Sequence, residues 1–585
     1  MRNKIFEKIP IVVPDRSGFD LSHENRGTAK VGILVPVMTR EMQGKDALSV
    51  NLGAQIQFAP FATDFYGRIK CYFEAFFVPY RIIDGNYKDL YRYSLSSLQG
   101  EGVGELAQED ENPYFEGLRV YNITTKGPEM NSLYPDIYAS RLTAAMTADP
   151  SVGLIGPGTL LDYLGCKCDP IYVGNGYSAN TPLYLNNRHR LDAYHRIYEE
   201  YYMDSRLQKH CYARYRSGNL NNDQMSRTIP YRATPLNSKN KYYLNDGPLL
   251  DGTYVTGLHA RNYSKDYFTT ATPDPQYGGE LGVMSDDTGR ITISQIRVAN
   301  ALQQFVELHN KVGNHYDDLA FALTGIRPSD AAVDIPIYLG RQVYDVYNKS
   351  VFNQADSSGV VDSSNPNPFS SVGSKYANGQ ALGSGHICDF TATEGGIFMI
   401  IMSVAPDASY GTGNARQWDY STIFDLPTPH LQGIGDQPIY KGELINSTYS
   451  HGSGNNEYFT LFDHDSVFGY SQRFAEAKFM LDETHAELRD YRSLSAFALK
   501  RSFETANSVA LGLNFIKVPT TALDEVSAII SDSDSNSFNP QSKFGYWFDI
   551  YFDVKLVSNL SAYSIPTLEN MKGNTVMVDN GGRRL

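Results

Sequence analysis

The chain is poor in cysteine and has no long apolar run. Its five cysteines are too few for a disulfide framework in 585 residues, and their odd number fits reduced thiols in a cytosolic protein. The N-terminal sequence MRNKIFEKIPIVVPDRSG has charges and prolines where a signal peptide needs an unbroken apolar stretch. No segment approaches the roughly 18 apolar residues of a membrane span. We therefore expect a soluble protein that is not exported through a cleaved signal.

The chain also lacks an excess of positive charge. Lys and Arg total 51 against 65 Asp and Glu, so the net charge is −14. A protein that works mainly by phosphate contacts is usually basic, because those contacts release counterions from the nucleic acid. Any nucleic-acid contact must therefore come from a local basic patch. The candidates lie at the chain ends, which are either solvated tails or arms against a nucleic acid: Arg2, Lys4, Lys8, Arg583 and Arg584.

Motifs for metal binding are missing as well. Only one residue separates Cys166 from Cys168, which is too close for two ligands of one tetrahedral zinc ion. We interpret these cysteines, and the later His210-Cys211 pair, as ordinary loop residues. The stretch SDSDSNSF (531–538) imitates the start of an EF-hand loop. It has Ser537 in place of the glycine and Lys543 in place of the final glutamate, so it predicts a solvated loop.

No catalytic constellation stands out from the background. The run HGSG (451–454) lacks the spacing and setting of a nucleophile turn. There is no P-loop and no dinucleotide-binding fingerprint. We therefore expect a protein that is not an enzyme and that binds no cofactor and no metal.

Aromatic residues, in contrast, are abundant, with 42 Tyr and 29 Phe beside 2 Trp. Tyrosine combines an apolar ring with a polar tip, which suits surfaces that are wet before assembly and buried after it. The same composition also fits an ordinary Tyr-rich β protein. The run YARYR (212–216) could stack unpaired bases, or its rings could belong to an interface or a core.

Period-two alternation predicts strands near both ends of the chain. Residues 28–38, 48–58 and 69–78 are β-like, with a turn at 43–46, and similar patterns return at 396–404, 459–463 and 544–557. Pro36 lies inside an apolar run, which favours an edge strand or a bulge there. Helical patterns embedded in loop lie between the two groups of strands, at 86–98, 140–147, 159–164, 190–207 and 294–308.

The last of these helical patterns is the clearest. Its apolar residues share one face: Ile296, Ala299, Leu302, Phe305 and Val306. After it, residues 354–385 are rich in Ser, Asn, Gly and Pro and predict a long surface loop.

One sheet system split by long insertions explains this order better than several independent domains. We predict a mainly β fold: a single viral jelly roll, an eight-stranded antiparallel β-sandwich or barrel with long loop and helical insertions. Residues 1–585 would form one domain, with strands mainly within 28–83 and 386–560. The insertions would occupy about 84–385, including the loop at about 354–385.

Several segments, taken in order, resemble the major capsid proteins of the Microviridae, especially the gokushovirus-like branch. RSGFDLSH (16–23) and GILVP (32–36) look like its N-terminal strand region, and FEAFFVPYR (73–81) is similar to its aromatic FFVP-x-R segment. TLLDYLG (159–165), AYHRIYEEYYMD (193–204) and KDYFTTA (265–271) look like its helical insertion and its KDYFTSALPWPQ stretch. The pattern continues through 296–308, Tyr316, Arg341, Ser403-Val404, Tyr410, Trp418, Phe424-Asp425 and YSQRFAE (470–476).

This resemblance implies a structural subunit. Sixty copies would form a T=1 shell, through fivefold, threefold and twofold contacts, around circular single-stranded DNA. It also implies synthesis in the bacterial cytoplasm and a virion surface that contributes to attachment to a host receptor. Further partners would be a small basic DNA-binding protein and a minor spike or pilot protein.

The sequence departs from the gokushoviruses in one place. They carry a long insertion after the KDYFTSALPWPQ stretch that forms threefold protrusions, whereas only residues 277–290 fill that gap here. We therefore expect no large spike from it, and residues 98–157 or 354–385 would shape the exterior instead. The alternative function is a phage receptor-binding or carbohydrate-binding β protein, whose Tyr, Trp and acidic loops would suit sugars. The ordered resemblance favours the shell protein.

Overall fold

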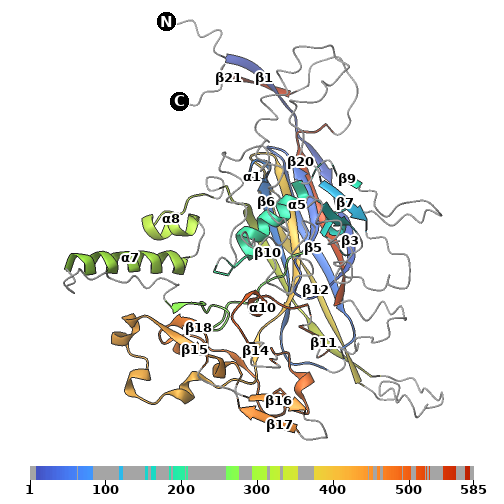
Figure 1. Ribbon diagram of the computed structural model, residues 1–585. Coiled ribbons are helices and arrows are strands. Elements are labelled where there is room, and N and C mark those ends of the chain that lie inside the picture. The colour runs from blue at the N-terminus through green and yellow to red at the C-terminus, as the bar shows by residue number, and fades with distance from the viewer. Residues whose placement is uncertain are drawn as a thin grey trace, which may run out of the picture.

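Two antiparallel β-sheets packed against each other form the body of the protein (Figure 1). A computed structural model describes most of residues 8–83, stretches between 118 and 207, residues 258–275, most of 293–352, most of 375–503, parts of 509–526, and residues 545–561 and 573–579. The first sheet has the order β10 (Ile337–Asp345), β6 (Ile69–Pro79), β13 (Gly396–Pro406) and β4 (Val35–Met42). The second has the order β11 (Tyr347–Phe352), β12 (Lys375–Thr391), β5 (Ala47–Phe58) and β20 (Tyr546–Ser558), with β2 (Ser17–Asp20) and β3 (His23–Ala29) both paired to β20.

The chain passes back and forth between the two sheets. It runs from β4 to β5 and back to β6, and later from β10 to β11 and β12 and back to β13. This wrapping is typical of a jelly roll, and it confirms the predicted mainly β, jelly-roll class. The described residues give the sheets four and six strands, two more than the eight expected. The difference arises because the short N-terminal strands β2 and β3 pair along β20.

The predicted turn and the predicted irregularity at Pro36 are both present. Lys45 takes a left-handed conformation, and the Asp46 amide donates to the Gln43 carbonyl, which closes the turn between β4 and β5. Strand β4 is the edge strand of its sheet, and its register against β13 shifts between Met38 and Pro36. Pro36 thus lies at a bulge on an edge, where a residue without an amide hydrogen does least harm.

The core lies between the sheets and continues under the helices. Alternate side chains of β5 and β20 are buried, as expected for strands with one face toward the core. Strands β6 and β13 are buried at nearly every position, because α5 (His189–Ile197) packs over the outer face of their sheet. Tyr194, Ile197 and Tyr198 join the same hydrophobic cluster as the strands.

The predicted helix at 190–207 is shorter and less regular than expected. It consists of α5 followed by the π-helix η4 (Tyr198–Tyr202), after which Met203 is extended. Arg196 pairs with Glu199 at 3.1 Å and with Glu200 at 2.6 Å across this junction. The neighbouring helical prediction at 159–164 corresponds to α4 (Leu160–Tyr163). The helices predicted at 86–98 and 140–147 lie outside the described residues.

Two predicted boundaries are wrong. Strands β10 and β11 lie within the interval expected to be an insertion, and β12 already begins at Lys375, inside the expected loop at 354–385. The Gly- and Ser-rich composition of this stretch predicted a loop, but in β12 the small residues allow neighbouring side chains to pack closely. A Cβ added at Gly383 would lie 2.1 Å from the ring of Tyr344 on β10. The glycine therefore belongs to the strand and makes room for a neighbouring ring.

A second hydrophobic cluster lies beside the sandwich, in the lower part of Figure 1. It contains Tyr267 and Phe268, together with Phe468, Phe503 and Phe515. Short elements surround it: β14 (Ser409–Tyr410), β19 (Asp482–Glu483), β15 (Asp436–Tyr440), β18 (Val467–Gln472), β16 (Ser447–His451), β17 (Glu457–Leu461) and α10 (Leu513–Ile516). Further elements are α1 (Tyr80–Ile83), β7 (Leu118–Asn122), β8 (Val152–Ile155) and β9 (Leu183–Leu185). Within the described part, no helix combines the length and the apolar character that crossing a bilayer requires.

Candidate functional site

Two strands, one from near each end of the chain, pair in a two-stranded ribbon. Strand β1 (Lys8–Pro14) pairs antiparallel with β21 (Gly573–Asp579), and Lys8 stands opposite Asp579 in the register. Figure 1 shows this ribbon at one end of the molecule. Of the five basic candidates, only Lys8 belongs to the described residues, as the first residue of β1. The other four lie outside them: Arg2, Lys4, Arg583 and Arg584.

A helical hairpin projects from the sandwich and exposes apolar side chains. It consists of α7 (Ile293–Val312) and α8 (Tyr316–Thr324), at the left of Figure 1. We name residues 293–327 the hairpin. Leu302 and Phe305, predicted to lie on one apolar face, are each 49% exposed. The exposed large apolar residues of the hairpin are Ile293, Ile296, Val298, Leu302, Phe305, Tyr316, Phe321, Leu323 and Ile326.

A second apolar surface covers residues 416–434, which we name the outward segment. It contains the 3-10 turns η7 (Arg416–Asp419), η8 (Ile423–Asp425) and η9 (Pro429–Ile434). Trp418 is 84% exposed, and the other exposed large apolar residues are Ile423, Phe424, Leu426 and Ile434. Such a cluster on a folded surface marks an interaction site more often than an accident of composition.

Polar groups hold the outward segment on the second cluster. The Arg416 guanidinium donates to the Glu443 carboxylate at 3.1 Å, and the Tyr420 hydroxyl donates to Glu476 at 2.9 Å. Arg473 donates to the carbonyl of Phe424 at 3.2 Å. The segment therefore turns its anchoring polar groups inward and its apolar side chains outward. In an ordinary surface loop the polar side chains face solvent and the apolar side chains face the core.

The buried end of this anchor is a carboxylate. Glu443 accepts hydrogen bonds from the hydroxyl of Tyr267 at 3.0 Å and from the amide of Tyr440 at 3.0 Å. Burial raises the pKa of Glu443, although these two donors and the Arg416 charge act in the opposite direction. Burial lowers the pKa of Arg416, but its carboxylate neighbours Glu443 and Glu476 outweigh this effect, so the net change is upward. The Arg416 charge thus opposes the effect of burial on the pKa of Glu443, and Glu443 raises the pKa of Arg416 in turn.

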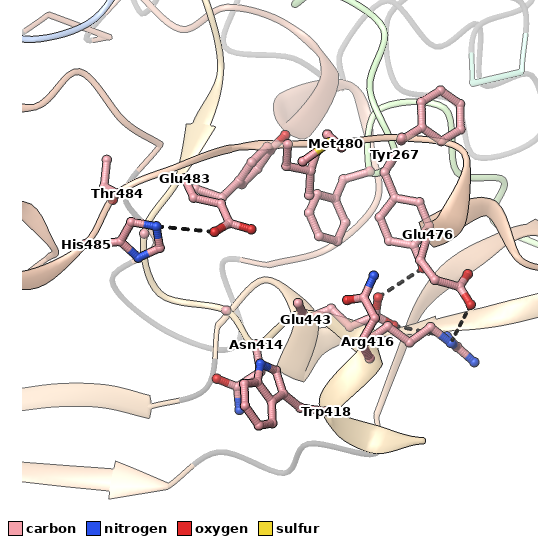
Figure 2. Close-up of a pocket in the computed structure, with 18 of the residues that line it drawn as sticks. Tyr267, Asn414, Arg416, Trp418, Glu443, Glu476, Met480, Glu483, Thr484 and His485 are labelled. Atoms are coloured by element: carbon pink, nitrogen blue, oxygen red, sulfur yellow. Dashed lines mark hydrogen bonds and ion pairs between the residues drawn. The ribbon is translucent and has the colours of Figure 1, made fainter. Parts of the chain in front are cut away.

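A pocket of about 540 Å³ opens beside this anchor (Figure 2). Figure 2 shows the Arg416 side chain directed toward Glu476, whereas the Trp418 ring is turned away from it. Met480, at the rim, is fully exposed. His485 lies 3.4 Å from Glu483, and both side chains are largely exposed. The carboxylates of Glu443 and Glu476 in this pocket bind Arg416 and the hydroxyls of Tyr267 and Tyr420. These contacts hold the outward segment in place.

A second pocket, of about 590 Å³, lies where the sandwich meets the second cluster. Its carboxylate is Glu74 of β6, which accepts from the Tyr202 hydroxyl at 2.5 Å and from Arg261 at 2.8 Å. The Arg261 guanidinium lies 3.8 Å from the centre of the Tyr72 ring. These contacts join η4 to β6, and they have a structural role.

Three ionisable residues lie in the core beneath α5. Lys517, which follows α10, is completely buried, and its ammonium lies 2.6 Å from the hydroxyl of Tyr198. His259 stacks on the Tyr198 ring at 3.7 Å between centroids, and its Nε2 lies 2.9 Å from Nδ1 of His195. Burial lowers the pKa of His259, and the nearby His195 and Lys517 lower it further.

The remaining sequence candidates contribute little to a site. Cys166 is half-buried, whereas Cys168, His210-Cys211, the run 212–216 and the stretch 531–543 lie outside the described residues. Most of the HGSG run is also outside them. Across the described part of the chain, no three His, Cys, Asp or Glu side chains are placed to hold a metal ion.

Sequence reasoning did not identify the outward segment. Its apolar residues come at irregular intervals in WDYSTIFDLPTPHLQGI, which follows neither a period of two nor one of 3.6. The sequence signals in this stretch were the density of large apolar residues and the family resemblance at Trp418 and Phe424-Asp425, and neither indicates an exposed surface.

Comparisons with known proteins agree on one family. The family model described as "Capsid protein (F protein)" matches residues 8–97 and 280–568, which is more than half of the chain. Capsid protein VP1 of Chlamydia phage 1 is 23% identical over 631 aligned positions that cover 98% of both chains. Capsid protein VP1 of Bdellovibrio phage phiMH2K is 24% identical over 278 positions, 47% of each chain. Capsid protein VP1 of Spiroplasma virus 4 is 22% identical over 216 positions, 36% of this chain and 35% of its own length.

Proposed function

The chain belongs to the capsid protein (F protein) family, as a major capsid protein of the Microviridae, and from this premise we propose that sixty copies close into a T=1 shell around circular single-stranded DNA. Each copy would contribute residues 1–585 as one capsid domain. Its place is the virion, and its role is structural. Synthesis and folding would take place in the cytoplasm of the bacterial host.

The observation that carries this proposal is the position of the exposed apolar side chains. The sandwich has a complete core of its own, whereas the hairpin and the outward segment present large apolar groups to solvent. Two different apolar surfaces on one subunit favour heterologous contacts, which close into rings around symmetry axes. Contacts of this kind, repeated around several axes, build a closed shell.

The charge of the chain bears on how a genome would be enclosed. At −14 per copy, an inner surface attracts DNA only if basic groups are gathered on it or if a small basic protein assists. The β1–β21 ribbon brings the two ends of the chain together, and both ends carry basic residues. We assign this end of the subunit to the interior of the shell, against the DNA.

The outer surface would contribute to attachment to a host receptor, alone or with a minor spike or pilot protein. The alternative, an isolated receptor-binding or carbohydrate-binding β protein, is disfavoured because the resemblance to capsid proteins extends over most of the chain. A sugar-binding module needs no hairpin that exposes apolar side chains on this scale.

Negative-stain electron microscopy separates the two functions. The full-length protein is expressed in bacteria, purified and imaged at high and at low concentration. We expect closed particles of uniform diameter at high concentration and a smaller population of them after dilution. Isolated monomers or trimers at every concentration would overturn the shell proposal in favour of the alternative.

A further inference from the structure

The apolar side chains of the hairpin are largely exposed in the single subunit. No side chain of α7 or α8 is among the buried residues of either hydrophobic cluster in the part of the chain that the structure describes. A helix in a globular protein gains most of its stability by packing its apolar face. An apolar face that includes Leu302 and Phe305 therefore requires a partner surface.

The charge of the hairpin indicates what kind of partner it meets. Residues 293–327 carry three basic side chains (Arg297, Lys311 and Arg327) and three acidic ones (Glu307, Asp317 and Asp318), so their formal charges cancel. The whole chain carries a net charge of −14, so two copies carry a net repulsion. A neutral apolar hairpin is a place where they can meet without that repulsion.

The outward segment supplies a second exposed apolar surface on the same chain. Arg416, Tyr420 and the Phe424 carbonyl fix its backbone, so its exposed side chains are held in place before any partner arrives. Preorganised apolar groups bind with a smaller loss of conformational entropy than mobile ones. In Figure 1 the hairpin and the outward segment both extend to the left, away from the sandwich.

We propose that α7 docks, through Leu302 and Phe305, on Ile423 and Phe424 of the outward segment of a second copy. This inference rests on the proposed shell function and names one of its contacts. The contact joins two different surfaces, so it is heterologous and propagates around a symmetry axis. Asn300 and Gln304 lie on the opposite, polar side of α7 and take no part in it.

Charge substitutions on the two sides of α7 test the docking. In the test variant, Leu302→Glu and Phe305→Glu place two carboxylates in the contact. In the matched control, Asn300→Glu and Gln304→Glu add the same charge to the polar side. At a fixed subunit concentration we expect the control to assemble like the unaltered protein. The number of particles formed by the test variant should fall by a factor of about thirty or more, as expected when an interface hot spot is lost.

A cross-linking experiment tests the partner surface directly. Chains carrying Phe305→Cys are co-expressed with chains carrying Phe424→Cys, and mixed particles are purified and mildly oxidised. We expect a covalent dimer that contains one chain of each kind and that is absent from particles made with either variant alone. Mixed particles that form no such dimer would overturn the assignment of the outward segment as the partner.

The outcomes also separate this inference from the shell proposal. If the unaltered protein forms no particles, the shell proposal fails. If the unaltered protein and the test variant assemble equally well, the shell proposal stands and the docking of α7 is wrong. If the test variant lowers the melting temperature of the unassembled subunit, then the apolar face of α7 is covered within its own chain. That result would overturn docking on a second copy.

Discussion

The ammonium of Lys517 lies 2.6 Å from the hydroxyl of Tyr198, and both groups are buried in the core beneath α5. Burial lowers the pKa of Lys517 from its ordinary value near 10.5 to about 7. Between these two values the unfolded chain carries a proton on this lysine that the folded chain lacks. The free energy of unfolding therefore rises with pH across this window, and below about pH 7 the full cost of burying a charge applies.

This relationship predicts how Lys517→Met changes stability with pH. At pH 6 the substitution removes a buried charge, which should raise the free energy of unfolding by on the order of several kcal/mol at most. The lost hydrogen bond to Tyr198 reduces this gain by about 1 kcal/mol. At pH 9 the lysine is already neutral in the folded chain, so the gain is much smaller. Urea unfolding of unassembled subunits at both pH values measures the difference. The exposed Lys555→Met is the control, and a gain that is the same at pH 6 and pH 9 would contradict the account.

The Arg416–Glu443 pair predicts a large loss of stability when its cation is removed. Arg416→Met leaves the Glu443 carboxylate, whose side chain is 2% exposed, without its nearest positive charge. Breaking a buried pair in this way costs about 3 kcal/mol, and Glu443→Gln in the same chain should restore part of it. Thermal unfolding of the subunit provides the measurement. The exposed pair of Arg26 with Asp549 is the control, since Arg26→Met should cost less than about 1 kcal/mol.

Equal losses from Arg416→Met and Arg26→Met would show that the inner pair is not needed to hold the outward segment.

The close packing of β12 against β10 predicts that Gly383 does not tolerate a side chain. A Cβ at this position would lie 2.1 Å from the Tyr344 ring, so Gly383→Ala forces the ring or the strand to move. Overpacking of this kind costs about 1–3 kcal/mol. Gly18, on β2, has no atom within 4 Å of the position of an added Cβ and serves as the control. Chemical unfolding should show a loss for Gly383→Ala and almost none for Gly18→Ala, and the opposite order would refute the packing.

The basic chain ends yield a prediction about the genome. Replacing all five basic residues (Arg2, Lys4, Lys8, Arg583 and Arg584) with Ala should leave the number of shells unchanged but reduce the DNA that they retain. The physical reason is the loss of phosphate contacts near the β1–β21 ribbon. Particles are counted by microscopy, and their nucleic acid is measured by the ratio of absorbance at 260 nm to that at 280 nm. Unchanged DNA content would discard the idea of terminal arms.

Much of the sandwich could be predicted from sequence, because half-buried antiparallel strands have a clear period of two. The strands β4, β5, β6, β13 and β20 all follow predicted stretches, and the irregularity at Pro36 was foreseen. Strand β12 could not be recognised. Its glycines accommodate rings from a neighbouring strand, and that information lies in the partner and not in the local pattern.

The candidate site was less accessible to sequence reasoning. The sequence predicted the helix α7 and its apolar face. The spacing of apolar residues is the same whether a helix packs on its own core or on a second copy, so it does not show which surface covers the face. The outward segment has no period at all. Lys517 stands in an ordinary run, NFIKVP, and nothing in that run shows that its side chain is buried beside Tyr198.

The mass of the assembled protein tests the central proposal most directly. Sedimentation velocity of the purified full-length chain, over a hundredfold range of concentration, should show a discrete particle of about 3.9 MDa, the mass of sixty 65.3 kDa chains, in equilibrium with small oligomers. A species of about 65 kDa that persists alone up to the highest concentration would contradict the proposal that copies of this chain close into a shell.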